Sequence, residues 1–186
     1  MQNQSKAALL VMDVQNGIVN RIGEENIVPF QQAVEAARQN DIPVIYIRLA
    51  FREGYPEASP RNKAFSAIST HGSMTASDAA VQIHESVRPL PGEPIVTKLR
   101  VSAFTGSDLE VILRSRGIDT LILSGIATSG VVLSTLREAA DKDYTITVLS
   151  DACLDPDPEV HRVLIEKIFP RQADVLTVSG WKETLA

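Results

Sequence analysis

The sequence predicts an α/β protein, a three-layer α/β/α sandwich around a mostly parallel, six-stranded sheet. Short apolar runs recur along the 186-residue chain with helix-like stretches between them, a pattern typical of doubly wound sheets. The runs are almost continuously apolar, as expected of parallel strands buried on both faces. Right-handed crossovers are expected to connect them. No internal repeat is visible, so one domain over residues 1–186 is expected.

Strands and helices are expected to alternate along the chain. The strands are predicted at Ala7–Met12, Pro43–Arg48, Pro94–Thr97, Thr120–Ser124, Tyr144–Ser150 and Ala173–Val178. The helices are predicted at about 25–40, 106–116, 128–142 and 157–168.

Local signals support two of these helices. Ser107 followed by Glu110 predicts a capping box, and Gly117 suits the end of that helix. The acidic, proline-containing stretch 155–159 predicts a turn that leads into a helix near Pro158. Residues 50–92 interrupt the alternation and predict a lid, a binding loop or a disordered insert, with a short helix at 76–87.

Composition excludes several classes of protein. The chain is 44% hydrophobic and 22% charged, with a net charge of −5 and no cluster of basic residues, which argues against a nucleic-acid partner. No apolar run approaches the roughly 18 residues of a membrane span, and no signal peptide is expected. One cysteine excludes an internal disulfide, and a cytoplasmic location is expected.

Two charged residues end predicted strands, where ligands bind in open α/β sheets. Asp13 follows the first strand and is either a functional group or a helix cap. Lys98 follows the third strand and is either a surface lysine or a group that stabilises negative charge on a substrate oxygen. Brought together in a partly desolvated cleft, the two would hold each other charged.

A third segment looks built to hold a nucleophile. Residues 121–132 predict a strand, a glycine-containing turn and a helix that begins at Thr128. A side chain in the first turn of such a helix faces backbone N–H groups and the positive end of the helix dipole. The alternative is an ordinary strand and core helix, which leaves Gly125, Thr128 and Gly130 unexplained.

Together these segments resemble the isochorismatase-like hydrolase superfamily, the cysteine hydrolases. The similarity includes Asp-Val-Gln-Asn after the first strand, the stretch from Lys98 to Leu109, and Gly125 to Ala139. The resemblance implies an isochorismatase-like, Rossmann-like fold and a catalytic triad of Asp13, Lys98 and a cysteine, whose position is Val131 here. It also implies a cis peptide at Ile126–Ala127 and an oxyanion hole from backbone N–H groups near Ala127 and Val131.

Further residues are expected to contact substrate. The resemblance implies that Gln15, Ala127 and Thr128 bind the substrate. Arg48, Arg52 and Arg61 lie at or after the second strand, where they either grip a substrate carboxylate or are ordinary surface arginines. Tyr55 and Phe104 are candidates for the pocket wall, and Phe104 is equally plausible in the core.

Other catalytic groups are not expected. Cys153 lies about twenty residues beyond the nucleophile position and is expected to be buried and inert. The nicotinamidases of the superfamily bind zinc through an Asp-x-His plus another His, whereas His71, His84 and His161 show no such spacing. No metal or other cofactor is therefore expected.

The resemblance suggests two precedents for function. Its cysteine-dependent members hydrolyse small amides through a thioester, a route that valine closes. True isochorismatases have glycine at this position and hydrolyse a vinyl ether by protonation from the aspartate, although valine leaves less room than glycine. The first hypothesis is therefore non-covalent hydrolysis of a small anionic metabolite. The alternatives are an inactive ligand-binding or oligomeric protein and an amidase with another nucleophile. A homo-oligomer is expected, with the helix at 128–142 as a candidate interface.

Overall fold

The computed structural model describes residues 6–185, apart from the side chains of Glu24, Ser69 and His71. Its centre is a parallel sheet of six strands in the order β3-β2-β1-β4-β5-β6. The strands are β1 (Ala7–Met12), β2 (Val44–Leu49), β3 (Ile95–Lys98), β4 (Thr120–Ile126), β5 (Thr145–Leu154) and β6 (Asp174–Leu176). All six predicted strands are therefore present; β1 has the predicted ends, and the ends of the other strands differ from the prediction by at most four residues.

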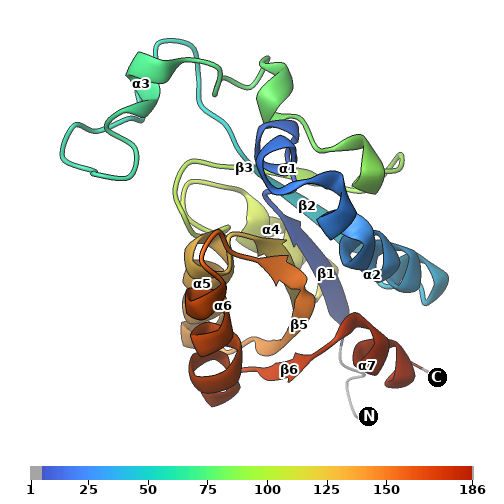
Figure 1. Ribbon diagram of the computed structural model, residues 1–186. Coiled ribbons are helices and arrows are strands. Elements are labelled where there is room, and N and C mark those ends of the chain that lie inside the picture. The colour runs from blue at the N-terminus through green and yellow to red at the C-terminus, as the bar shows by residue number, and fades with distance from the viewer. Residues whose placement is uncertain (1–5, 186) are drawn as a thin grey trace.

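Helices cover both faces of the sheet (Figure 1). One face packs against α4 (Leu109–Arg116), α5 (Leu133–Asp141) and the turn Leu164–Ile168 that follows α6 (Pro158–Val163). The other packs against α1 (Asn16–Ile22), α2 (Val28–Gln39) and α7 (Val178–Glu183). Successive side chains of β1 point to opposite faces of the sheet. Leu10 therefore packs in the hydrophobic cluster on the face covered by α4 and α5, and Leu9 in the cluster on the face covered by α1, α2 and α7. The predicted three-layer sandwich is confirmed.

The predicted helices differ from the observed ones in detail. The expected helix at 128–142 begins as a π-helical turn (Thr128–Val132) before α5, and the one at 157–168 is α6 followed by a second π-helical turn (Leu164–Ile168). Gly117 ends α4 in the left-handed conformation, as predicted. The prediction of a capping box was wrong, because the Glu110 side chain accepts from Arg114 and Lys142 and not from a backbone N–H group.

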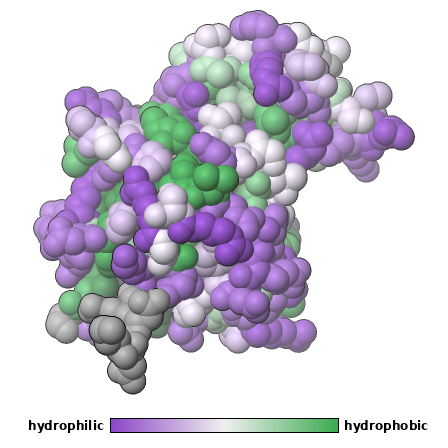
Figure 2. Space-filling view, turned by 180° about the vertical axis from the view of Figure 1, so that it is seen from behind, coloured by the Kyte–Doolittle hydropathy of each residue, from purple (hydrophilic) through white to green (hydrophobic). Residues whose placement is uncertain are grey.

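Residues 50–92 contain little regular structure. They include α3 (Ile68–His71) and two 3₁₀ turns, Ala79–Val81 and Glu85–Val87, in place of the single helix expected at 76–87. Part of this segment, with α3, extends from the body of the molecule in Figure 1. Figure 2 shows the same projection from behind, above a largely hydrophilic surface with scattered hydrophobic patches. A 3₁₀ turn at Glu24–Ile27 precedes α2, and another at Phe169–Arg171 precedes β6.

Candidate functional site

Asp13 and Lys98 form a buried ion pair at the carboxyl edge of the sheet. Asp13 follows β1 and Lys98 ends β3, and the Lys98 ammonium lies 3.0 Å from Oδ2 of Asp13. The side chains of Lys98 and Asp13 are only 2% and 8% exposed, respectively. Lys98 also donates to the carbonyls of Arg100 and Val101 at 3.0 and 3.2 Å, so all three of its protons have an acceptor.

The second carboxylate oxygen of Asp13 is free for another contact. Oδ1 is buried and has no hydrogen-bond partner within residues 6–185. Asp13 also has a φ of 60°, a left-handed conformation that is uncommon outside glycine and recurs at functional sites. Burial raises the pKa of Asp13, and the charge and hydrogen bond of Lys98 act in the opposite direction without cancelling it. A carboxyl group with a raised pKa keeps its proton to higher pH than an ordinary aspartate, which is a property of general acids.

The turn after β4 has the geometry implied by the resemblance. The Ile126–Ala127 peptide is cis, and the chain then enters the π-helical turn Thr128–Val132. Gly125 is required here, because an added Cβ would lie 2.9 Å from the carbonyl oxygen of Met12. Two side chains fix the turn from outside: Asp155 accepts from the Ser129 N–H at 2.7 Å, and Thr128 Oγ1 lies 2.8 Å from Nδ1 of His161.

Val131, which the resemblance places at the nucleophile position, is apolar and buried. It is 2% exposed and belongs to the hydrophobic cluster that also contains residues of α4 and α5. Cys153 is 1% exposed, its thiol points to the Leu123 carbonyl, and burial raises its pKa to about 12. A thiol with that pKa is almost entirely protonated at neutral pH, so Cys153 is a poor replacement for the missing nucleophile.

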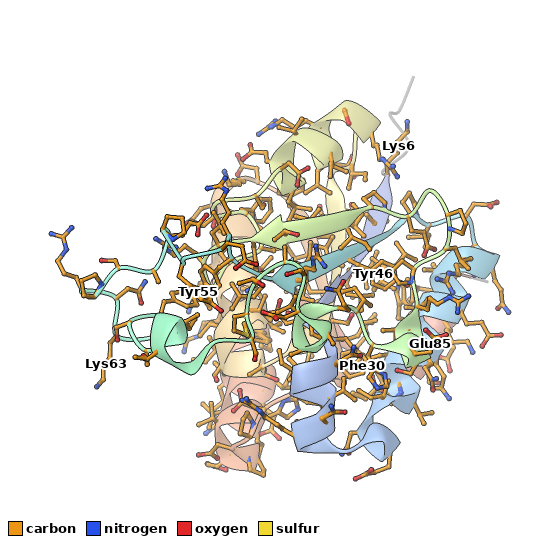
Figure 3. The ribbon with its side chains drawn as sticks, turned by 90° about the horizontal axis from the view of Figure 1, so that it is seen from above. Lys6, Phe30, Tyr46, Tyr55, Lys63 and Glu85 are labelled. Carbon is orange, nitrogen blue, oxygen red and sulfur yellow. The ribbon has the colours of Figure 1, made fainter. Side chains whose placement is uncertain are left out.

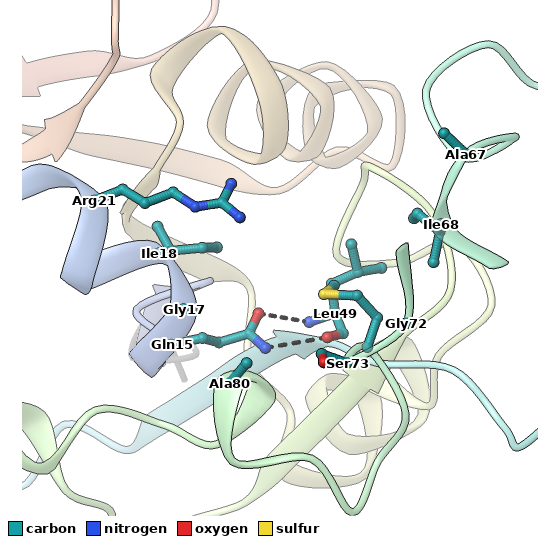
Figure 4. A pocket seen from close by; sticks show the side chains of 11 residues that line it. Gln15, Gly17, Ile18, Arg21, Leu49, Ala67, Ile68, Gly72, Ser73 and Ala80 are labelled. Carbon is teal, nitrogen blue, oxygen red and sulfur yellow. Dashed lines mark hydrogen bonds between the residues drawn. The ribbon is translucent and has the colours of Figure 1, made fainter. Parts of the chain in front are cut away.

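A cavity of about 590 Å³ lies near the carboxyl ends of β1 and β2, and neither Asp13 nor Lys98 is among the residues that line it (Figure 4). Its walls include Gln15, two residues after Asp13, and Leu49, which neighbours Lys98 in the sheet. The Gln15 amide donates to the carbonyls of Leu49 and Val81 and accepts from the Leu49 N–H. The side chain expected to contact substrate therefore holds the cavity wall together.

Other residues predicted to bind substrate lie outside the walls of this cavity. Arg52 is paired with Glu57, Arg48 bonds Thr97 and Gln82, and Tyr55 accepts from the Met74 N–H. Figure 3 shows Tyr55 on the extended segment that also carries Lys63. Phe104 is buried in the core against Tyr144, which favours the second of its two predicted roles.

The structure reveals one site residue that sequence reasoning missed. Arg21 lies on α1, a seven-residue helix too short for its hydrophobic periodicity to predict it, and lines the cavity. A basic residue in the last turn of a helix also has an ordinary role beside the helix dipole, so the sequence offered no distinguishing signal.

Metal ligands do not gather within the described part of the chain. No group of three His, Cys, Asp or Glu side chains there is arranged to hold a metal ion. Of the three histidines, the side chain of His71 lies outside the described structure, and His161 bonds Thr128. None of the helices within residues 6–185 is long and apolar enough to span a membrane.

Comparisons with known proteins agree with this geometry. A model of the isochorismatase domain matches residues 7–179. The uncharacterized isochorismatase family protein YwoC of Bacillus subtilis is 35% identical over 167 residues, covering 89% of this chain and 87% of the relative. The ureidoacrylate amidohydrolase RutB of Stutzerimonas stutzeri is 32% identical, covering 95% of this chain and 79% of the relative.

Solved structures show the same fold. An isochorismatase family protein from Burkholderia thailandensis superposes with a TM-score of 0.85 at 29% identity, covering 97% of this chain and 95% of that one. N-carbamoylsarcosine amidase from Thermoplasma acidophilum gives a TM-score of 0.75 at 26% identity, covering 93% and 96%. Strand order, strand-end residues, the cis peptide and these similarities lead to one conclusion: the chain belongs to the isochorismatase-like hydrolase family.

Proposed function

We propose that this protein hydrolyses a small anionic metabolite without a covalent intermediate, using Asp13 and Lys98. The observation that carries the proposal is the buried ion pair in which Lys98 holds Oδ2 of Asp13 while Oδ1 remains unpartnered within the described chain. An unpartnered carboxylate oxygen in a dry site is costly for folding alone, and a substrate or water that bonds it removes that cost.

In the proposed reaction, protonated Asp13 donates its proton to the substrate as a general acid. Burial favours the neutral acid that this step needs. Water then adds to the resulting electrophilic carbon and returns a proton to the Asp13 carboxylate, and the hemiketal so formed breaks its original C–O bond, with its hydroxyl proton passing to the leaving alcohol and a carbonyl group remaining. Lys98 holds Oδ2 of Asp13 and so leaves Oδ1 for the substrate, while its positive charge attracts the anionic group of the substrate. A vinyl ether suits this chemistry, because protonation of its enol carbon creates an oxocarbenium-like centre that water can trap.

Amides and ureides are the competing substrate classes. The ureidoacrylate amidohydrolase and the N-carbamoylsarcosine amidase among the similar proteins act on such bonds by name. Amide hydrolysis through a thioester requires a thiol at position 131, where this chain has valine. This difference favours the non-covalent route.

The decisive experiment is to screen the protein against vinyl ethers, amides and ureides and then to test Asp13→Asn. Turnover should disappear in Asp13→Asn while circular dichroism still shows the native fold. Asp41→Asn is a matched control, since Asp41 also has a positive φ, of 54°, but is exposed. Asp13→Asn with undiminished turnover would disprove the proposal.

A second candidate is a ligand-binding protein without catalysis, which the buried Val131 favours. Saturable binding of members of the panel with no product from any class would support it. The same screen therefore separates the two functions.

A further inference from the structure

Arg21 extends from α1 along one side of the 590 Å³ cavity, above Ile18 (Figure 4). The remaining walls are mostly apolar and include Leu49, Ile68 and Met74. The polar Gln15 amide is already bonded to the backbone. Arg21 is therefore the charged group that this cavity offers to a ligand along its described walls.

The Arg21 guanidinium has no ion pair or hydrogen bond to another described residue, and it differs in this from the arginines nearby. Arg52 is held by Glu57, and Arg48 bonds Thr97 and Gln82. Arg100 donates to the carbonyls of Leu99 and Glu57. The guanidinium of Arg21 therefore keeps its planar set of donors available for an anion.

The surroundings of Arg21 indicate on which side an anion would bind. A second cavity of about 540 Å³ on the other side of Arg21 contains Asp155, whose negative charge opposes a bound anion. The described walls of the 590 Å³ cavity carry no acidic side chain. Neither Asp13 nor Lys98 lines this cavity, but Gln15 follows Asp13 by two residues and Leu49 pairs with Lys98, so a ligand held by Arg21 lies at the edge of the sheet that carries the ion pair.

We propose that Arg21 binds the carboxylate of the substrate, and that the substrate is a small monocarboxylate with an apolar body. One free cation matches one carboxylate, which a guanidinium binds through two parallel hydrogen bonds. The apolar walls match the rest of the molecule. This inference rests on the proposed hydrolase function for its catalytic meaning, whereas carboxylate binding itself is testable without turnover.

The binding test uses benzoate as the probe and benzamide as its uncharged counterpart, measured by isothermal titration calorimetry. Benzoate should bind the unaltered protein more tightly than benzamide. Arg21→Gln should weaken benzoate binding about tenfold or more, as expected for loss of a charge-assisted pair. Arg21→Lys should retain part of the affinity, because it keeps the charge but loses the planar geometry.

Arg171→Gln is the matched control and should leave benzoate affinity unchanged, since Arg171 is exposed in the 3₁₀ turn before β6, remote from the cavity lining. Three results would overturn the inference: no benzoate binding to the unaltered protein, equal binding of benzamide, or equal binding of benzoate to Arg21→Gln. None of these results depends on whether the protein is an enzyme.

Kinetics then separate this inference from the proposed function. With a hydrolysed monocarboxylate, Arg21→Gln should raise KM about tenfold and leave kcat nearly unchanged, whereas Asp13→Asn should abolish kcat. Turnover that survives in Asp13→Asn removes the hydrolase mechanism but not carboxylate binding by Arg21. Loss of kcat in Asp13→Asn with unaltered KM in Arg21→Gln contradicts the role of Arg21 alone.

Discussion

Leu49 pairs with Lys98 in the parallel register of β2 and β3, so a residue of the cavity wall and the ammonium of the buried ion pair are neighbours in one sheet. Asp13, the other member of the ion pair, is also held by the backbone of β2, because its N–H donates to the Ile47 carbonyl at 2.9 Å. The central strands therefore position both charged groups and the cavity with regular backbone hydrogen bonds. This rigidity makes the consequences of single substitutions specific.

Replacing Lys98 by Met should destabilise the fold by about 3–5 kcal/mol at neutral pH, because it leaves Asp13 charged or newly protonated in a dry site. Urea denaturation measures the effect. The double variant Asp13→Asn/Lys98→Met should recover part of the loss, since neither buried charge remains. Equal stability of Lys98→Met and the unaltered protein would show that the pair is not buried in solution.

Asp13 should make stability fall as pH rises. Its pKa in the folded protein is raised above the ordinary value of 3.8, so the unfolded chain loses this proton first as pH increases. The stability present below about pH 3.8 is then lost as pH rises through the folded pKa. The free energy of unfolding of Asp13→Asn, measured by urea denaturation at a series of pH values from acidic to neutral, should lack this contribution. An unchanged slope relative to the unaltered protein would contradict a raised pKa.

The same ionisation should appear in the kinetics. A general acid must be protonated, so kcat/KM for a vinyl ether should decrease as pH rises through the raised pKa of Asp13. The pH–rate profile of the unaltered protein tests this sign. A rate that increases over that range would assign Asp13 the role of a base instead.

Val131→Cys should introduce amide hydrolysis if the remaining site supports the chemistry of the cysteine hydrolases. The substitution should lose only about 1 kcal/mol of stability, because it removes little buried volume. Val132→Cys is the matched control, since Val132 is equally buried and lies against the Cβ position of Gly125. Activity in both variants, or in neither, would contradict a specific role for position 131.

Thiol labelling provides an internal check on that experiment. Position 131 is only 2% exposed in the folded protein, so Val131→Cys is treated with iodoacetamide after denaturation, and mass spectrometry should then find label on both thiols. In the folded protein, native Cys153 should stay unlabelled, because burial raises its pKa to about 12 and removes its thiol from solvent. Label on Cys153 in the folded protein would contradict its inert role.

Gly125→Ala should destabilise the protein by about 1–3 kcal/mol, because its Cβ would lie 2.9 Å from Cβ and the carbonyl oxygen of Met12. Gly130→Ala in the same turn should be nearly neutral, since the nearest atom to its Cβ is 3.9 Å away. Thermal unfolding compares the two. Equal losses would mean that loss of backbone freedom, rather than contact with β1, determines the effect.

The sequence by itself determined the sandwich and the residues at its strand ends. Continuous apolar runs around Leu9 and Ile122 require burial on both faces, and only helices on both sides of a parallel sheet provide it. The positions of Asp13 and Lys98 after such runs, together with the glycine turn, predicted where the site would form.

Tertiary structure alone decided which side chains are available to a ligand. Arg52 and Arg21 are both basic residues outside strands, yet one is paired with Glu57 and the other faces the cavity. Gln15, which was expected to contact substrate, lines the cavity, and its side-chain amide bonds the backbone of Leu49 in β2. These outcomes depend on contacts between segments far apart in the chain, which local patterns of hydrophobicity and turn residues do not encode.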